Sequence, residues 1–313
     1  MLRFTADRRT LAFITAYYAL VVYQWMAPSP FVGVRIALVM LTCAISWIAA
    51  VITHNTLHSP VFKNRTLNRM FQVVLTCAYG FPVSEYVPGH NLSHHRYMQQ
   101  RRDVMRTTKV NTSSNLLNFI LFVPRVAFDV TGANMRYMKI MRDQRPQWFH
   151  QFIIEATFCW GSKLVLLAID WRKTLPIIVL PHLFAVWGIT AVNYLQHDGA
   201  DDEHPYNHSR NFVGRVFNWF TFNNGFHGMH HLEPGLHWSL LAKAHEEQVH
   251  PHIDPRLEQK SLLVYVFHAF FWPGQRVRFD GKAMVIPEEG PDLDWIPATG
   301  GSNPELGAVA GEL

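Results

Sequence analysis

The sequence predicts an all-α membrane protein, with four transmembrane helices arranged as two hairpins and a helical cap on the cytoplasmic side. Hydrophobic residues make up 49% of the 313-residue chain and charged residues only 16%, whereas soluble domains average about 25% charged residues. The longest apolar runs come in two close pairs, and many of the 18 histidines are clustered. We expect residues 1–286 to form a single integral-membrane domain and residues 287–313, rich in Pro, Gly and acidic residues, to form a loose tail.

The four expected membrane helices lie in two pairs of apolar runs. Residues 11–27 and 31–52 form the first pair, and residues 149–169 and 175–195 form the second, with a short linker at 170–174. A helix needs about 20 mostly apolar residues to cross a bilayer. Because few residues separate the two members of each pair, each pair predicts a hairpin.

Two further apolar segments are too short to cross a membrane. We expect residues 71–84 to form a re-entrant, interfacial or buried segment. In residues 116–128 the apolar run is interrupted by Pro124 and Arg125, a composition that favours an interfacial helix.

Basic residues predict the orientation of the chain. Near the turns of the two hairpins stand only Arg35, Arg172 and Lys173. The segments on the other side carry Lys63, Arg65, Arg69, Arg96, Arg101, Arg102, Arg106, Lys109, Arg136, Lys139, Arg142 and Arg145. The positive-inside rule therefore places both termini and the cap in the cytoplasm, and we expect a multi-pass protein of a bacterial inner membrane. These basic residues form no compact tract with interleaved aromatics, so nucleic acid is not an expected partner.

Eight histidines fall in three clusters whose spacing suits metal binding. Residues three or four apart lie on one face of an α-helix, so each cluster aims at least two imidazoles at a common point. Under the two-hairpin topology all three clusters lie at the same membrane face. Imidazole is a suitable ligand for Fe, Zn, Cu or Ni. The clusters are His54 with His58, then His90 with His94 and His95, and finally His227 with His230 and His231.

The number of histidines indicates two metal ions in the cap. Eight imidazoles exceed the four positions of one tetrahedral zinc, and they suit two ions that each keep an open position for O₂. A lone histidine at such a place is more often a helix cap or an interfacial residue, but that explanation fails for three clusters on one side. The three cysteines lie in apolar runs without a CxxC pattern, so no thiolate site is indicated.

The order and spacing of the histidine clusters resemble the histidine boxes of the membrane fatty-acid desaturase family, part of the histidine-box diiron desaturase and hydroxylase superfamily. The resemblance covers roughly residues 11–245. It implies a membrane oxidoreductase whose cofactor is a pair of iron ions held almost entirely by histidines, with O₂ as the co-substrate.

The resemblance also implies one more ligand just after the fourth apolar run, where Asn193 and His197 stand. It suggests His197 as a ninth imidazole and Asn193 as the holder of a metal-bound water. From the residues alone, the two share a helix face, and a buried Asn193 needs a polar partner; His197 could instead be an interfacial residue near Asp198. The full expected set of metal ligands is His54, His58, His90, His94, His95, His197, His227, His230 and His231, with Asn193 acting through water.

The expected activity is O₂-dependent oxidation of an unactivated C–H bond in a fatty-acyl or similar apolar chain, with desaturation favoured. Side chains alone cannot supply such an oxidant, so the metal and O₂ must. The alternatives are a hydroxylase of an alkyl or acyl chain or ring, an oxidative decarboxylase that makes a terminal alkene, and, outside enzymes, a histidine-rich membrane metal transporter or sensor. The sequence contains no haem, nucleotide or iron–sulfur motif, so a separate ferredoxin, rubredoxin or cytochrome-type electron donor is expected beside the lipid substrate.

Supporting residues can also be named. Metal-bound imidazoles usually donate their other N–H group to a carboxylate or a carbonyl, and we expect His208 to be either solvated or in such a supporting role. His182, inside the fourth apolar run, is expected to bond another helix, near Glu155, and not a metal. The candidate carboxylates are Glu85, Asp103, Asp198 and Glu233.

Overall fold

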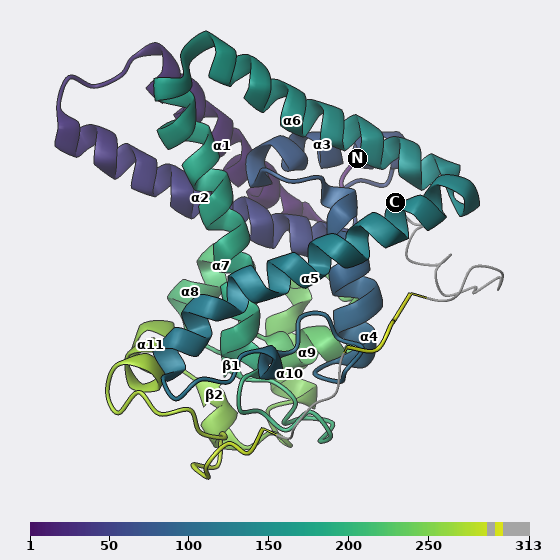
Figure 1. The fold of residues 1–313 in the computed structure, drawn as a ribbon, viewed down its shortest axis with the longest axis vertical. Helices are drawn as coiled ribbons and strands as arrows, with labels where there is room; N and C mark the ends of the chain where they lie inside the picture. The colour runs from purple at the N-terminus through teal and green to yellow at the C-terminus, as the bar shows by residue number, and fades with distance from the viewer. Residues whose placement is uncertain (287–291, 297–313) are drawn as a thin grey trace. The chain divides into compact units, whose positions relative to one another are not determined.

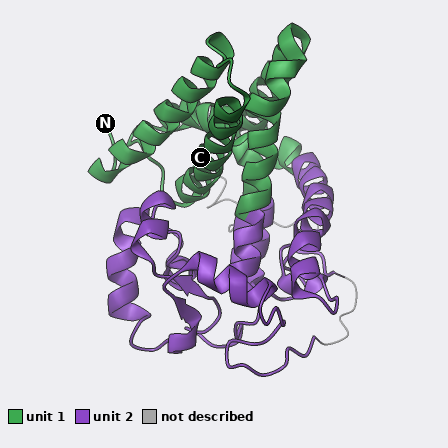
Figure 2. Cartoon of the chain, turned by 90° about the vertical axis from the view of Figure 1, so that its left-hand side faces the viewer, with its two compact units in different colours: residues 1–87, 141–189, 307–313 green, residues 88–140, 190–306 purple. Residues whose placement is uncertain are grey.

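The structure is a computed structural model that describes residues 1–286 and 292–296. The chain divides into two compact units, which Figure 2 draws in green and purple. Unit 1 comprises Met1–Val87 and Met141–Ile189, and unit 2 comprises Pro88–Ile140 and the described residues from Thr190 onward. Helices dominate both units (Figure 1), which confirms the mainly helical fold expected from the sequence.

Unit 1 is a set of packed helices. The first helix packs against the second, and the third packs against both of them and against the sixth. A buried apolar cluster that includes Ala50, Tyr79 and Ala185 joins residues from three of these elements. The elements are η1 (Thr5–Asp7), α1 (Arg8–Met26), α2 (Val32–His58), α3 (Arg65–Tyr79), η2 (Val83–Glu85), α6 (Pro146–Thr174), η5 (Leu175–Val179) and the first part of α7 (Leu180–His197).

Local sequence explains where helices α2 and α3 begin and end. The residue before a proline avoids the helical region, and Ser59, which precedes Pro60, is extended at the end of α2. Helix α3 begins after Asn64, whose side chain accepts a hydrogen bond from the amide of Leu67 at 3.0 Å. It ends at Gly80, whose φ of +99° is open mainly to glycine.

Three helical stretches of the described chain are long and apolar enough to cross a membrane: Val32–His58, Asn115–Gln144 and Pro146–His197. The last one covers 52 residues and combines α6, η5 and α7. Its backbone breaks at Asp170 (φ −156°, ψ 90°), within the linker predicted between the third and fourth apolar runs. Helix α1, with 19 residues, is not among the three stretches, so the arrangement of four spans in two hairpins stays a prediction.

Apolar side chains on the outside of unit 1 suit contact with lipid. Ile36 and Met40 of α2 and Leu164 and Ile169 of α6 are between 59% and 67% exposed. Large exposed apolar surfaces are uncommon on soluble monomers and mark interaction or membrane surfaces. Together with the three long apolar stretches, these side chains fit a membrane protein.

The segment at 71–84 falls mainly in α3, which has 15 residues and is too short to span a bilayer. Leu75 and Ala78 are fully buried. Val74, in the same segment, is 39% exposed, so the choice between a re-entrant, an interfacial and a buried segment stays a prediction.

The expectation of a short helix at 116–128 is wrong in its length. Helix α5 (Asn115–Gln144) has 30 residues and continues through Pro124. A proline removes one amide donor from a helix, but here apolar side chains on both sides of it, Phe122 and Val126, are buried in the core of unit 2. Tertiary packing thus carries the helix past the proline that interrupts the apolar run.

Unit 2 is built from most of α5, the end of α7 and a series of short elements. Phe122, Tyr194, Phe212 and Phe270 meet in one buried apolar cluster. The two short strands pair in parallel, with Asn211 opposite Glu258. The short elements are η3 (Pro88–His94), α4 (His95–Tyr97), η4 (Thr107–Lys109), β1 (Asn211–Phe212), α8 (Arg215–Phe220), α9 (His227–Leu232), η6 (Trp238–Leu240), α10 (Leu241–Gln248), η7 (Pro255–Leu257), β2 (Glu258–Gln259) and α11 (Leu262–Phe270).

Part of the predicted tail packs on unit 2. Asp292 accepts hydrogen bonds from Arg106 and from Lys109, the latter at 2.7 Å, and Trp295 and Ile296 are buried. The prediction of a loose tail otherwise concerns residues 287–291 and 297–313, which lie outside the described residues. The expected domain boundary at residue 286 stays a prediction.

His182 bonds another helix, as expected, but its partner lies in α1. Its Nε2 atom is 2.8 Å from the hydroxyl of Tyr17. Glu155 has different partners: its carboxylate accepts from the backbone amide of Ser84 at 2.7 Å and from the side chain of Gln151 at 2.9 Å. Each of these two buried polar groups is thereby paired.

We predict that Gly80→Ala destabilises the protein. A Cβ atom at this position would overlap Cβ and Cγ of His182, and alanine would have to adopt a φ of +99°. The expected loss is about 2 to 4 kcal/mol, measured as a lower unfolding temperature in detergent micelles. The control is Gly161→Ala in α6, where no atom lies within 4 Å of the added Cβ. Equal unfolding temperatures for the two variants would contradict the prediction.

Candidate metal centre

Seven of the nine predicted histidine ligands lie in unit 2, where they form two groups. In the four-histidine group, one nitrogen from each ring lies within 4.8 Å of the others. Its members are His94, His197, His227 and His231. The three-histidine group meets the same limit and consists of His90, His95 and His230. The remaining two predicted ligands, His54 and His58, belong to unit 1.

The second histidine cluster forms a π-helix, η3, which is followed directly by α4. Hydrogen bonds in a π-helix run between residues five apart, so residues at that spacing share a face. His90 and His95 accordingly bring their Nε2 atoms to 3.0 Å. The ring of His94, by contrast, lies 4.9 Å from the ring of His197. The adjacent residues His94 and His95 therefore belong to different groups.

The third cluster lies on helix α9 and is also divided between the groups. His227 and His231 are four residues apart, and their Nε2 atoms lie 3.1 Å from each other. His230 points to the other group, with its Nε2 atom 3.1 Å from that of His95. Asn211 holds the first turn of α9, because its side-chain oxygen accepts from the amide of Gly228 at 2.8 Å.

His197 is the last residue of helix α7. Its Nε2 atom lies 2.8 Å from Nε2 of His227, and its Nδ1 atom lies 3.1 Å from the carbonyl oxygen of His208. A carbonyl can only accept, so Nδ1 carries the proton and donates it. The neutral ring then keeps a lone pair on Nε2, the form that binds a metal.

Asn193 lies one turn before His197 on α7 and is buried. Its side-chain amide donates to the carbonyl oxygen of Met105 at 3.1 Å, which is the polar partner that its burial required. Its role in holding a metal-bound water stays a prediction.

Asp103 orients His94 within the four-histidine group. Its carboxylate lies 2.9 Å from Nδ1 of His94 and also accepts from the amides of Gln99 at 2.9 Å and Met105 at 2.7 Å. Burial alone would raise the pKa of Asp103, but the attraction of His94 and these hydrogen bonds outweigh it and hold the pKa below its usual value. The resulting carboxylate fixes the proton of His94 on Nδ1, as a carboxylate behind a metal-bound histidine does.

The loop that carries Asp103 is tied to the π-helix through one hydroxyl group. Ser93, fully buried, donates to the carbonyl oxygen of Arg102 at 2.8 Å and accepts from the amide of Val104 at 2.9 Å. These two bonds flank Asp103 on both sides. The carboxylate is therefore held in place against the ring of His94.

The environment favours the neutral form of two imidazoles at the four-histidine group, those of His231 and His208. Burial and the neighbouring rings of His95 and His227 hold the pKa of His231 well below its ordinary value. Burial also lowers the pKa of His208 to about 4. Only a neutral imidazole can bind a metal, because a protonated ring has no free lone pair.

The spacing of the nitrogen atoms in the four-histidine group matches that of ligands around one metal ion. Metal–imidazole bonds of about 2.0–2.1 Å place two ligands at right angles about 3 Å apart, and the Nε2 atoms of His197 and His231 lie 2.8 and 3.1 Å from Nε2 of His227. Nε2 of His94 is buried and has no hydrogen-bond partner among the described residues. The group therefore fits an ion with nitrogen ligands.

The first cluster forms a pair at the end of α2 in unit 1. The rings of His54 and His58 lie 5.4 Å apart, in agreement with the predicted shared face. The ring of Tyr86 stacks on His54 with 6.2 Å between the ring centres.

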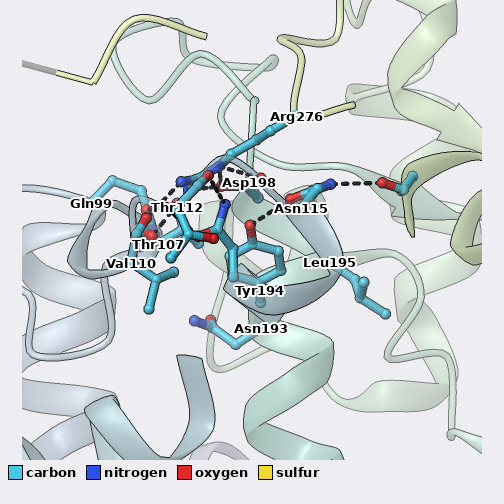
Figure 3. A network of polar contacts seen from close by, with 12 residues as sticks. Gln99, Thr107, Val110, Thr112, Asn115, Asn193, Tyr194, Leu195, Asp198 and Arg276 are labelled. Carbon is cyan, nitrogen blue, oxygen red and sulfur yellow. Dashed lines mark hydrogen bonds and ion pairs between the residues drawn. The ribbon is translucent and has the colours of Figure 1, made fainter. Parts of the chain in front are cut away.

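Of the four candidate carboxylates, Asp198 has a structural partner other than a histidine. It forms an ion pair with Arg276, which also donates to the carbonyl oxygens of Val110 at 2.6 Å and Thr107 at 3.1 Å (Figure 3). Because Asp198 directly follows His197, this network fixes the C-terminal end of α7 within unit 2.

His208 is buried and takes the second of its two expected roles, a supporting one, but it does so through its main chain and not its ring. Its carbonyl oxygen accepts from His197 and its ring lies 5.7 Å from the ring of His231. Every residue has a carbonyl group, so the sequence carries no signal for this contact.

We predict that Asp103→Asn weakens metal binding while the protein still folds. The amide keeps the size of the carboxylate but cannot stabilise His94 as an anion does, and loss of such a partner costs about 10- to 100-fold in metal affinity. The measurement is iron content after equilibration in buffered Fe(II). The control is Asp143→Asn, which removes the same charge from a side chain that is 71% exposed. If both variants retain equal iron, Asp103 does not have this role.

Comparison with known proteins agrees with this geometry. The family model described as fatty acid desaturase matches residues 28–259, more than half of the chain and a range that includes every predicted ligand. No curated protein matches the chain. The match, the histidine groups and the apolar helices lead to one conclusion: the chain belongs to the fatty acid desaturase family of membrane oxidoreductases.

Proposed function

We propose that the protein uses two iron ions and O₂ to oxidise an unactivated C–H bond in a fatty-acyl or similar apolar chain, and that the reaction is a desaturation. The observation that supports this most strongly is the four-histidine group with Asp103 behind His94, in a chain of the fatty acid desaturase family. Family membership gives the class of reaction. The nitrogen-only donor set favours iron over the oxygen-preferring Mg²⁺ and Ca²⁺.

The proposed ligands divide between the two ions. One ion would be held by the four-histidine group. The three-histidine group would contribute to the other ion. His54 and His58 stay predicted ligands, because their spacing is that of a histidine box. Asn193 would contribute through a water molecule.

The protein groups around the proposed metal ligands would keep the imidazoles neutral and hold their protons in place. When bound, the metal pair would activate O₂ and so supply the oxidising power towards the substrate, which no side chain offers. Asp103 and the carbonyl of His208 keep the Nδ1 protons of His94 and His197 in place, so both Nε2 atoms stay available. The low pKa of His231 prevents protonation from competing with the metal at neutral pH.

We propose a multi-pass membrane protein with two hairpins, in a bacterial inner membrane, with both termini and the histidine groups on the cytoplasmic side. The excess of basic residues outside the hairpin turns supports this orientation. The substrate would then be a membrane lipid or a fatty-acyl chain.

A separate electron donor of the ferredoxin, rubredoxin or cytochrome type is also proposed. Two of the basic residues near the second cluster already form ion pairs. Arg106 pairs with Asp292, and Lys109 pairs with both Asp292 and Asp129. Arg96 and Arg102 are exposed and lie on the same aromatic ring, that of Tyr97, at 5.3 and 5.4 Å. An acidic donor could therefore meet the charges of Arg96 and Arg102, whereas those of Arg106 and Lys109 are already paired.

His94→Ala and His231→Ala should each abolish substrate oxidation and lower the iron content below the wild-type value, which we expect to be about two ions per chain. Each change removes a nitrogen donor but leaves the apolar helices intact, so membrane insertion should persist. The measurements are elemental analysis and product formation. As a control, His250→Ala alters a histidine that is half exposed and bonded to Glu258. Zinc in place of iron, or full activity in either ligand variant, would contradict the proposal.

Lipid extracts from a host that expresses the protein should contain new double bonds. Gas chromatography with mass spectrometry separates the possible products, and the same host with the His94→Ala variant provides the background. New hydroxyl groups would instead identify a hydroxylase, and volatile terminal alkenes would identify a decarboxylase.

A further inference from the structure

Three basic residues that are far apart in the sequence converge on one cavity of unit 1. Arg35 lies in the first turns of α2, and Arg172 and Lys173 lie at the end of α6. All three line a cavity of about 680 Å³. They are also the three basic residues near the hairpin turns, on the side where the positive-inside rule expects few. Their convergence on one cavity requires a physical explanation.

The cavity carries more positive than negative charge. Its one acidic lining residue is Asp170, whose carboxylate lies 4.0 Å from the Nζ atom of Lys173. Lys173 also donates to the carbonyl oxygen of Trp25 at 3.1 Å. Among the described residues Arg35 and Arg172 have no acidic partner. Like charges in one cavity repel each other, most strongly where the medium is less polar than water, and a bound anion would remove that repulsion.

The rest of the cavity is mainly apolar and continues along the helices. Val39 lies one turn beyond Arg35 on α2 and lines the same cavity, as residues four apart share a helix face. Ile36, Met40 and Leu180 also line it and remain between 49% and 61% exposed. The cavity wall is thus basic at the helix ends and becomes apolar one helical turn further along.

The start of α2 adds to the positive field. This helix has 27 residues, and the start of a helix carries a partial positive charge from its free amide groups. Val32, its first residue, is part of the cavity wall. The contribution is small beside the three full charges, but it has the same sign.

We propose that this cavity binds an anionic phospholipid. The headgroup phosphate would lie against Arg35, Arg172 and Lys173, and an acyl chain would lie along the apolar wall that contains Val39 and Leu180. Basic pockets between membrane helices bind anionic headgroups in this way. A free phosphate would leave the apolar wall uncovered, and a zwitterionic lipid would leave the excess positive charge without compensation. The site needs no metal, so the inference is independent of the proposed reaction.

The test measures lipid binding to the purified, metal-loaded protein in an uncharged detergent. Native mass spectrometry gives the affinities for phosphatidylglycerol and for phosphatidylcholine with the same acyl chains, and thermal unfolding is followed with each lipid and with inorganic phosphate. We expect phosphatidylglycerol to bind about tenfold more tightly than phosphatidylcholine and to raise the unfolding temperature. Inorganic phosphate at the same concentration should not raise it.

The double variant R35Q/R172Q should lose that tenfold preference. The matched control R142Q/K243Q removes the same charge from side chains that are 65% and 79% exposed, and it should keep the preference. R35K/R172K changes the same two residues but preserves their charge, so it should retain most of the preference. If it does, the loss in R35Q/R172Q comes from the lost charge and not from misfolding.

Three results would overturn the proposal. The first is equal binding of the two lipids by the wild-type protein, a measurement that needs no variant. The second is unchanged phosphatidylglycerol binding by R35Q/R172Q, and the third is stabilisation by inorganic phosphate equal to that by the lipid, which would indicate a site for small anions. Because none of these measurements involves oxidation, they remain informative whatever reaction the histidine groups support.

Discussion

The four-histidine group depends on one constraint: its buried imidazoles must direct lone pairs at a common space, and in two of them the Nδ1 proton is already held by a hydrogen bond. Asp103 commits the proton of His94, and the carbonyl of His208 commits that of His197. Lone pairs brought together in a medium of low polarity repel each other, and a cation converts that repulsion into attraction. The binding energy of the metal is therefore linked to the packing of the residues that hold these rings.

That packing joins distant parts of the chain. The rings come from the second cluster, the end of α7 and α9, and these elements are held by the core of unit 2, by the pair Asp198–Arg276 and by Asn211. Few of these contacts are local, so the chain must close long loops before the group can form. Apolar burial provides the main driving force for that closure. The site is thus a product of the tertiary fold and not of any single helix.

Much of the site was predictable, because histidine spacing and apolar runs are visible directly in the sequence. The parts that were not predictable share a physical cause, since they depend on contacts between distant residues. The sequence offered four carboxylates as partners of the imidazoles, and only packing selects Asp103 for His94. Likewise, Asp292 neutralises Arg106 and Lys109 from far along the chain, and the core of unit 2 carries α5 past Pro124.

The π-helix at Pro88–His94 has a consequence for how the chain can vary in length. In an ordinary helix each added or deleted residue rotates the remainder of the helix by about 100°, so a change of one residue between His90 and His95 would turn one of the two away from the common point. The loop at 201–206, which carries no predicted ligand, faces no such limit. At positions of the π-helix other than His90, Ser93 and His94, substitutions that preserve burial should therefore be tolerated far better than insertions or deletions.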